Sequence, residues 1–282
     1  MTRGLAKLHS LNARWLYLGA SILLVIPFVV PISPPPGRPS RAVQGLYDMI
    51  EKCPANGIVW IDSAWDQGSR AENEAELECV VRHLCRRRIR FVVTSLGCQF
   101  GPEFAAKVIT PIVGEAGYTY GTDWANLGFV QCNAGLPVVI NSLANNFKSV
   151  REKDVDGTPV DELPLMKDVK TIQDFYMVYA VTYSPPQEWI SFVKGQFGTP
   201  VAFGCMSIMG PYYQTFFESG QLSGMLVGDR GSAQYEALLG HRSLGTKLSM
   251  VASFGNVAII LAALFGNLGM WAVRRARRSP SP

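Results

Sequence analysis

The sequence predicts an α/β protein: a doubly wound, mostly parallel sheet of about five strands, flanked by two transmembrane helices. The first observation is the stretch from Gly57 to Gly101, where an apolar run, a polar loop, a helical pattern and a second apolar run follow one another. This order is typical of the βαβ unit, whose two strands are parallel. The second observation is that apolar runs and helical patterns continue to alternate through the middle of the chain. The third is an uncharged apolar segment near each end.

Five apolar runs are expected to form the strands of the sheet. The first reads Ile58-Val59-Trp60-Ile61, a continuous apolar run as found in strands that are covered on both faces. Three long stretches contain no predicted strand: residues 33–42 are a Pro-rich linker, 146–171 a polar excursion over the sheet, and 219–231 a glycine-rich segment. The five predicted strands are residues 58–61, 90–95, 118–129, 172–183 and 200–206.

Helices are predicted between these strands. The helix from Ala71 to Arg88 has acidic residues in its first half and Arg86, Arg87 and Arg88 at its end, which matches the helix dipole. We therefore interpret its acidic run as a solvated face, with apolar residues on the opposite face. The other helices are predicted at residues 43–53, 102–115, 135–145, 186–197 and 211–217, and from about residue 232.

Composition excludes some classes of protein. The net charge of +4 is concentrated near the two termini, so it does not indicate a nucleic-acid partner. None of the cysteines forms a CxxC pair, which argues against a structural zinc site of the usual spacing. We expect buried thiols, and the sequence leaves disulfides open. The cysteines are Cys53, Cys79, Cys85, Cys98, Cys132 and Cys205.

The first apolar segment, residues 15–32, is predicted to be a transmembrane helix. It has no charge, and its length of about 18 residues is sufficient to cross the hydrocarbon core of a bilayer. A secretory signal peptide has the same basic start and is the alternative. Proline residues follow at Pro31 and Pro34 to Pro36, where a cleavage site of small residues would be expected. We therefore favour an uncleaved anchor.

The second predicted transmembrane helix covers residues 248–273. Arg274, Arg275, Arg277 and Arg278 follow it, and residues 1–14 before the first helix are also basic. The positive-inside rule therefore places both termini in the cytoplasm. The domain of residues 43–247 is then extracytoplasmic, and residues 274–282 form a cytoplasmic tail. We expect an integral membrane protein, in a bacterial inner membrane.

One face of the second predicted span carries small and amide residues. Asn256 and Asn267 are eleven residues apart, about three helical turns, and therefore point in nearly the same direction. Small residues allow helices to approach closely in lipid, and an amide there requires a partner. Besides the bilayer, the expected partners are other membrane subunits or a second copy of this helix; tolerated polarity is the alternative. The predicted interface is Gly255, Asn256, Gly266, Asn267 and Gly269.

Candidate ligand-binding residues follow from the fold class. Ligands of doubly wound sheets bind outside the carboxyl ends of the strands. Polar residues at the predicted strand ends are therefore the candidates, although no motif supports them. They are Asp62, Ser63, Asp66, Thr94, Ser95, Cys98, Asn126, Ser184 and Ser207.

Two catalytic hypotheses were considered for these positions. Asp62, Asp66 and Asp123 together could bind a divalent cation through carboxylate oxygens. Cys98, before a predicted helix, could be a nucleophile, but it would need a base, and His83 lies within a helix. The GxSxG, GxGxxG and Walker A patterns are absent. The sequence thus predicts no catalytic residue, metal or cofactor.

The paired acidic residues Asp154 and Asp156 are interpreted as part of a solvated loop.

Three stretches are similar to a known family. They are YGTDWANLGF at 120–129, GTPVDELPLMK at 157–167 and SGQLSGMLVGDRGSAQYE at 219–236. Together they resemble an uncharacterised prokaryotic family of membrane-anchored α/β proteins. The resemblance covers most of the middle domain and implies its fold and anchoring, but no activity.

Three functions remain open from the sequence. We favour a non-enzymatic accessory or scaffold subunit of a membrane protein complex, because the chain has two predicted anchors and no catalytic constellation. The alternative is an extracytoplasmic domain that binds or senses a small molecule at the polar strand ends. A hydrolase that uses Asp62 or Cys98 ranks third.

Overall fold

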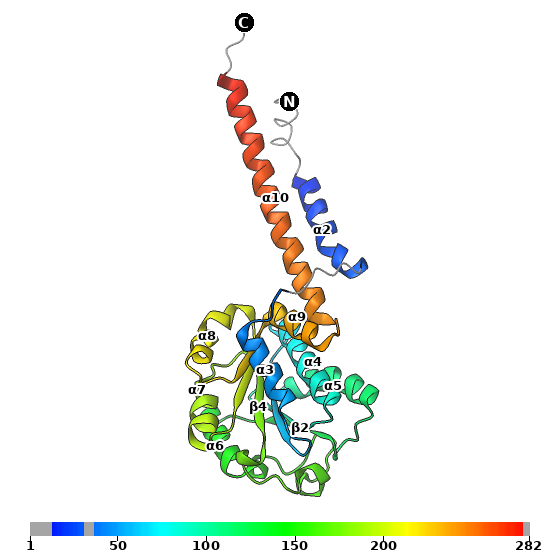
Figure 1. Cartoon of the computed structure of the whole chain (residues 1–282), viewed down its shortest axis with the longest axis vertical. Coiled ribbons are helices and arrows are strands. Elements are labelled where there is room, and N and C mark those ends of the chain that lie inside the picture. Colours follow the sequence, from blue (N-terminus) through cyan, green and yellow to red (C-terminus); the bar gives the residue numbers. More distant parts are fainter. Residues whose placement is uncertain (1–12, 31–36, 279–282) are drawn as a thin grey trace. The chain divides into compact units, whose positions relative to one another are not determined.

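The chain divides into two compact units, which are described separately. The computed structural model describes residues 13–30 and 37–278. One unit is the α/β domain, residues 36–246, and the other combines the two end segments, residues 1–35 and 247–282. Figure 1 shows the strands and their surrounding helices in the domain, and the helices α2 and α10 in the end segments.

The domain contains a single sheet of six parallel strands. Its order is β3-β2-β1-β4-β5-β6, so the direction of strand addition reverses between β1 and β4. Every neighbouring pair is parallel, as the βαβ pattern predicted. The strands are β1 (Ile58–Ala64), β2 (Arg90–Leu96), β3 (Trp124–Val130), β4 (Met177–Thr182), β5 (Val201–Cys205) and β6 (Gly224–Val227).

The sixth strand, β6, is missing from the sequence-based prediction. It has only four residues and lies in the glycine-rich segment for which no strand was predicted. It pairs with β5, with Ala202 opposite Gly224. Four residues are too few for a hydrophobic period to stand out, so the strand is specified by its neighbours in the fold rather than by its own pattern.

Helices cover both faces of the sheet, which confirms the doubly wound arrangement. Leu77, Ile109 and Tyr235, from α4, α5 and α9, belong to the core on one face. Ile140 and Tyr213, from α6 and α8, belong to the core on the other. The domain helices are α3 (Arg41–Glu51), α4 (Arg70–Arg86), α5 (Gly101–Ala116), α6 (Leu136–Asn145), α7 (Gln187–Trp189), α8 (Gly210–Glu218) and α9 (Gly228–Leu239).

The two outer strands contact other parts of the chain in different ways. Helix α3 packs on a face of β6, so closely that a Cβ atom at Gly224 would overlap the backbone nitrogen of Leu46. At the opposite edge, the segment after α6 lies along β3. There the Val155 N–H donates to the Asn126 carbonyl (3.1 Å) and Arg151 Nε donates to the Leu127 carbonyl (2.8 Å). Free strand edges would otherwise invite pairing with other chains.

Asp154, predicted to lie in a solvated loop, is buried. Its Oδ1 accepts the backbone N–H groups of Asp156 (2.9 Å) and Thr158 (2.8 Å), and its Oδ2 accepts the Tyr120 hydroxyl (3.0 Å). The prediction was wrong because the fold supplies hydrogen-bond donors to the Asp154 carboxylate. These bonds compensate for the hydrogen bonds to water that the carboxylate loses on burial.

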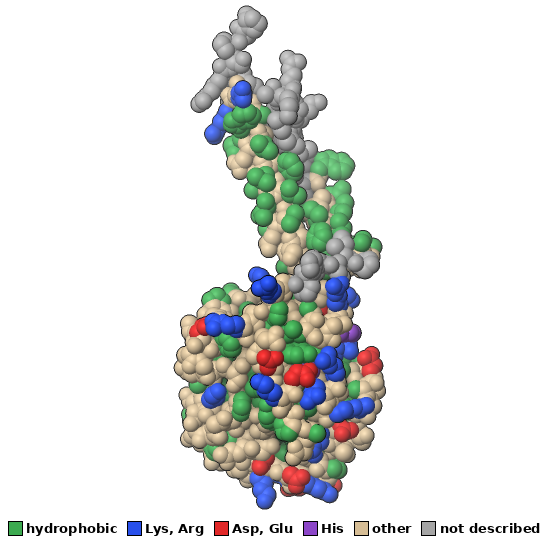
Figure 2. All heavy atoms as spheres, in the orientation of Figure 1, with side chains coloured by type: hydrophobic (Ala, Val, Ile, Leu, Met, Phe, Trp, Pro, Cys, Tyr) green, Lys and Arg blue, Asp and Glu red, His purple; other side chains and the backbone are tan. Residues whose placement is uncertain are grey.

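Only one of the two predicted membrane helices is clearly long enough to span a bilayer, among the residues that the structure describes. Helix α10 (Leu244–Arg278) contains the candidate span Leu244–Arg275, in which an 18-residue window has a mean hydropathy of 2.1. Helix α2 (Ala13–Val29) has 17 residues, a rise of about 26 Å against a hydrocarbon core of about 30 Å. Residues 31 and 32 of the first predicted span, 33–36 of the linker, and 1–12 and 279–282 of the two tails lie outside the described residues. Figure 2 shows hydrophobic side chains along these helices and charged ones on the domain.

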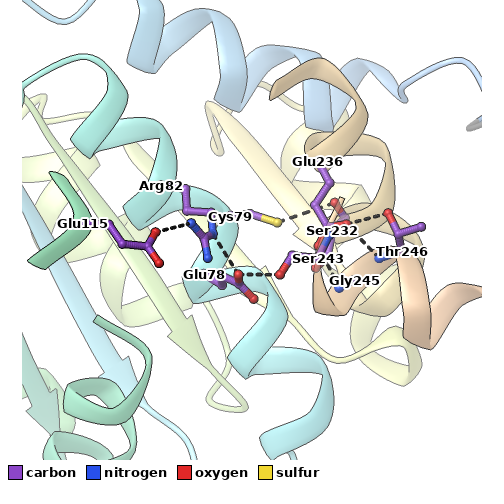
Figure 3. A network of polar contacts seen from close by, with 9 residues as sticks. All are labelled: Glu78, Cys79, Arg82, Glu115, Ser232, Glu236, Ser243, Gly245 and Thr246. Atoms are coloured by element: carbon purple, nitrogen blue, oxygen red, sulfur yellow. Dashed lines mark hydrogen bonds and ion pairs between the residues drawn. The ribbon is translucent and has the colours of Figure 1, made fainter. Parts of the chain in front are cut away.

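The start of α10 is bound to the domain by one buried carboxylate, that of Glu236 in α9. Glu236 accepts the backbone N–H groups of Ser243 (2.8 Å), Gly245 (2.8 Å) and Thr246 (2.9 Å), and also the Thr246 hydroxyl (2.5 Å). Beside it, the Ser243 hydroxyl donates to Glu78 of α4 (2.5 Å). Figure 3 shows this network. It satisfies N–H groups at a helix start that have no partner within the helix.

The tight contact between α3 and β6 gives the first prediction. We expect Gly224→Ala to lower the free energy of unfolding by about 1–3 kcal/mol, because the added methyl group overpacks against Leu46. The control is Gly114→Ala in α5, where a Cβ atom would have no neighbour within 4 Å. Alanine is the better helix former, so we expect that change to be stabilising or neutral. Urea unfolding of the two variants measures both effects; equal effects would contradict the assigned packing.

The second prediction concerns the cap of α10. In Glu236→Gln an amide NH₂ group replaces one acceptor oxygen and faces N–H donors, so we expect the stability to fall by about 2–4 kcal/mol. The control is Glu218→Gln, which alters an exposed pair with Arg41 and is expected to cost less than about 1 kcal/mol. Thermal unfolding in detergent compares them. A Glu236 variant as stable as the Glu218 variant would refute the capping role.

Candidate functional site

Asp62 is the central residue at the carboxyl ends of β1 and β2. Its Oδ1 accepts the Leu96 N–H (2.9 Å) and the Thr94 hydroxyl (3.1 Å), and the Thr94 oxygen accepts Trp60 Nε1–H (2.8 Å). Asp62 is only 1% exposed. Burial raises the pKa of its carboxyl group from 3.8 to about 8, although both hydrogen bonds favour the charged form. Asp62 thus adds side-chain hydrogen bonds between β1 and β2.

Ser63 and Ser95 are also engaged within the fold. The Trp65 indole N–H donates to the Ser63 hydroxyl (2.7 Å), and the Ser95 hydroxyl donates to the Cys98 carbonyl (2.7 Å). The start of α5 lies directly over them, since a Cβ atom at Gly101 would overlap the Ser95 hydroxyl oxygen. Both hydroxyl groups therefore position the loops that follow the carboxyl ends of β1 and β2. The chain itself occupies the space beyond these strand ends.

Cys98 lies near Asp62 but does not have the environment of a nucleophile. Its thiol donates to the Trp65 carbonyl (3.1 Å), and burial raises the pKa of the thiol, which disfavours the thiolate. His83, the base considered for it, belongs to another network. The His83 ring nitrogens contact the Tyr235 hydroxyl (2.7 Å) and Glu51 (3.0 Å) on α9 and α3. The structure therefore gives Cys98 and His83 separate hydrogen-bond partners.

The three aspartates considered for a cation are not brought together. Asp66 is exposed and accepts the backbone N–H groups of Gly68 (2.9 Å) and Ser69 (3.3 Å). Asp123 precedes β3 at its amino end, where its carbonyl accepts the Phe91 N–H at the start of β2 (3.1 Å). Because all strands are parallel, Asp62, near the carboxyl end of β1, and Asp123, at the amino end of β3, lie at opposite ends of the strands. Within the described residues, no group of three or more His, Cys, Asp or Glu side chains has a metal-binding arrangement.

The remaining candidates have hydrogen-bond partners other than Asp62. Asn126 is buried at an irregularity of β3, where its Oδ1 accepts the Gly128 N–H (3.0 Å). The Ser184 N–H donates to the Thr182 hydroxyl oxygen (3.0 Å), and the Ser184 carbonyl accepts the Tyr213 hydroxyl. Ser207 follows β5 and is exposed; its N–H donates to Glu72 (2.5 Å). These three residues thus make separate contacts within the fold.

A buried acidic group was missed by the sequence analysis. Glu76 of α4 is fully buried, whereas its acidic run was expected to be a solvated face. Its carboxyl group accepts the Gly228 N–H at the start of α9 (2.9 Å) and the Asn73 amide (2.8 Å). Burial raises the pKa of Glu76 well above its ordinary value. Room for it exists because Gly204 has no side chain: a Cβ atom there would lie 2.8 Å from Glu76 Oε2. Helical charge patterns give no signal for this contact.

One cavity lies beside Ser207, at the carboxyl ends of β5 and β6, with a volume of about 560 Å³. Helices α3, α8 and α9 all begin around it. Its charged lining residues are Arg38 and Arg230, and neither guanidinium group takes part in an ion pair among the described residues. The rest of the lining is Ser40, Val43, Ser207, Gly210, Pro211, Gln214, Met225, Val227, Gly231 and Gln234.

No protein-family model matches the chain, and no curated protein or solved structure matches it. The family resemblance therefore stays a prediction. The class of protein that the fold itself defines is an α/β protein with a doubly wound parallel sheet and, among the described residues, one helix, α10, that is long and apolar enough to span a membrane.

The raised pKa of Asp62 gives a third prediction. Its folded pKa of about 8 lies above the unfolded value near 3.8. The contribution of Asp62 to stability is therefore fully present below about pH 4 and is lost as the pH rises from there through about 8. An asparagine at this position would keep the acceptor oxygen without titrating. We expect Asp62→Asn to gain stability relative to the wild type between about pH 5 and about pH 9.

The gain should reach a few kcal/mol, since each unit of pKa displacement corresponds to about 1.4 kcal/mol. Urea unfolding followed by tryptophan fluorescence at both pH values measures it. Asp66→Asn, which changes an exposed carboxyl group, is the control and should show a much smaller pH-dependent difference. A difference that is the same for both variants would contradict the burial of Asp62.

Proposed function

We propose that the chain is a membrane-anchored, non-enzymatic accessory or scaffold subunit of a membrane protein complex. In this proposal α10 is the anchor, the α/β domain is extracytoplasmic, and the membrane is a bacterial inner membrane. The observation that carries the proposal is a pair of asparagine amides exposed on the largely apolar surface of α10.

These amides are Asn256 and Asn267. Both are exposed, and Asn267 Nδ2 donates to a carbonyl of its own helix, that of Ala263 (2.8 Å). An amide that faced lipid would leave polar atoms without partners, which is costly. A neighbouring helix with its own polar groups would supply those partners. The two side chains therefore support association within the membrane.

The glycines of the predicted interface are not equivalent. A Cβ atom at Gly255 would lie 3.5 Å from Leu24 of α2, so this position is next to the first helix, whereas one at Gly266 would have no neighbour within 4 Å. Gly269 is buried. Gly266 thus lies beside Asn267 as an uncovered small residue that another helix can approach closely. This favours a partner from another chain at the Gly266 end of the helix.

Two further points support the proposal. Asp62 and Cys98, on which the hydrolase hypothesis relied, make structural hydrogen bonds within the domain. Arg274 and Arg275 directly follow the apolar part of α10, and the positive-inside rule places such residues in the cytoplasm.

The test is purification of the full chain from membranes in a mild detergent, through a C-terminal tag, with every co-purifying polypeptide identified. We expect stable partners for the wild type and a loss of at least about tenfold in their yield for the double variant Asn256→Leu, Asn267→Leu. Ser253→Leu is the control, because its exposed hydroxyl donates within the helix to the Ser249 carbonyl (2.8 Å).

Native mass spectrometry distinguishes a second copy of the chain from other subunits. A wild-type protein that is extracted as a lone monomer would refute the proposal. Partners that the asparagine variant retains would refute the assigned interface.

A further inference from the structure

The cavity beside Ser207 combines a positive lining with an apolar wall. Among the described residues that line it there is no carboxylate side chain, and its charged residues are Arg38 and Arg230. Val43, Pro211 and Met225 provide apolar surface next to them. Its volume of about 560 Å³ lies within the range of about 300–1,000 Å³ that is typical of small-molecule sites.

Neither of the two arginines has an acidic side-chain partner among the described residues. Arg41, for comparison, forms an ion pair with Glu218 (2.7 Å), and Arg82 pairs with Glu78 (2.8 Å). Arg38 and Arg230 come from opposite ends of the domain sequence, and the fold brings both to one cavity. Both side chains are exposed, and the two guanidinium charges attract an anion that enters the cavity.

The helix starts around the cavity offer few free N–H groups. In α3 the Val43 N–H donates to the Ser40 hydroxyl, and in α9 the Gly228 and Arg230 N–H groups donate to Glu76 and Asp229. Helix α8 begins at Gly210, whose N–H donates to the Ser207 carbonyl, and the proline that follows has no N–H. The positive charge of the cavity is therefore that of the two arginines, with the positive end of the α8 dipole beside them.

We propose that this cavity binds the phosphate group of an organic phosphate. Arg38 and Arg230 hold the phosphate oxygens, and the apolar part of the ligand packs on Val43, Pro211 and Met225. The planar, five-donor guanidinium group suits phosphate better than a lysine would. The phosphate belongs either to a soluble phosphomonoester or to a phospholipid headgroup. This binding site goes beyond the accessory role proposed above and does not depend on it.

The experiment uses the full chain in a maltoside detergent, which carries no phosphate. Isothermal titration calorimetry with phenyl phosphate, and separately with dihexanoyl-phosphatidylglycerol, measures the affinity. We expect saturable binding of at least one probe, and a loss of about tenfold or more in each of Arg38→Gln and Arg230→Gln. Arg242→Gln changes an exposed arginine outside the cavity and should leave the affinity within about twofold.

The two probes separate the sources of phosphate. Tighter binding of phenyl phosphate assigns a soluble ligand, and tighter binding of the short-chain lipid assigns a headgroup; both support the site if the cavity arginines are required. Phenylacetate, a carboxylate of similar size, should bind more weakly than phenyl phosphate. The proposal is overturned if neither probe binds, if phenylacetate binds equally well, or if the Arg38 and Arg230 variants, with unfolding midpoints of the wild type, bind as the wild type does.

Discussion

Buried carboxyl groups that accept backbone N–H groups hold this protein together. Asp62 connects the end of β1 to β2, Glu76 connects α4 to the start of α9, and Glu236 connects α9 to the start of α10. Each bond fixes a point where one element begins or ends, so the element positions depend on these side chains. A buried carboxyl group is tolerated only while its donors are in place. The position of the first turn of α10 therefore depends on α9 of the α/β domain.

Much of the fold could be predicted from the sequence. The features that were missed depend on contacts with residues that are distant in the sequence. The continuous apolar runs of β1 and β2, and the helical period between them, identified the parallel sheet because both signals are local. Strand β6 was missed because four residues carry no period. Glu76 and Asp154 were expected in solvent, since their partners, the N–H of Gly228 and the hydroxyl of Tyr120, are brought to them only by the fold.

The candidate site was predicted less well than the fold. The rule that ligands bind at strand ends led to Asp62, Ser63, Thr94 and Ser95, but polar side chains at strand ends also hold the loops that follow. Here Asp62 and Thr94 connect the two strands, whereas Ser63 and Ser95 position the loops that follow, and α5 begins directly over these two serines at Gly101. Ser207, another candidate, lies beside the cavity described above. Arg38 and Arg230 carry no motif and are far apart in the chain, so only the three-dimensional arrangement could indicate them.

The covering of one sheet edge has a consequence for association. An outer strand with a free edge presents a row of unpaired backbone groups, to which another chain can add a further strand. Arg151 and the Val155 N–H donate to carbonyl groups of β3, so the chain itself occupies the edge of this strand. Contacts on this side of the domain are therefore left to side chains rather than to backbone.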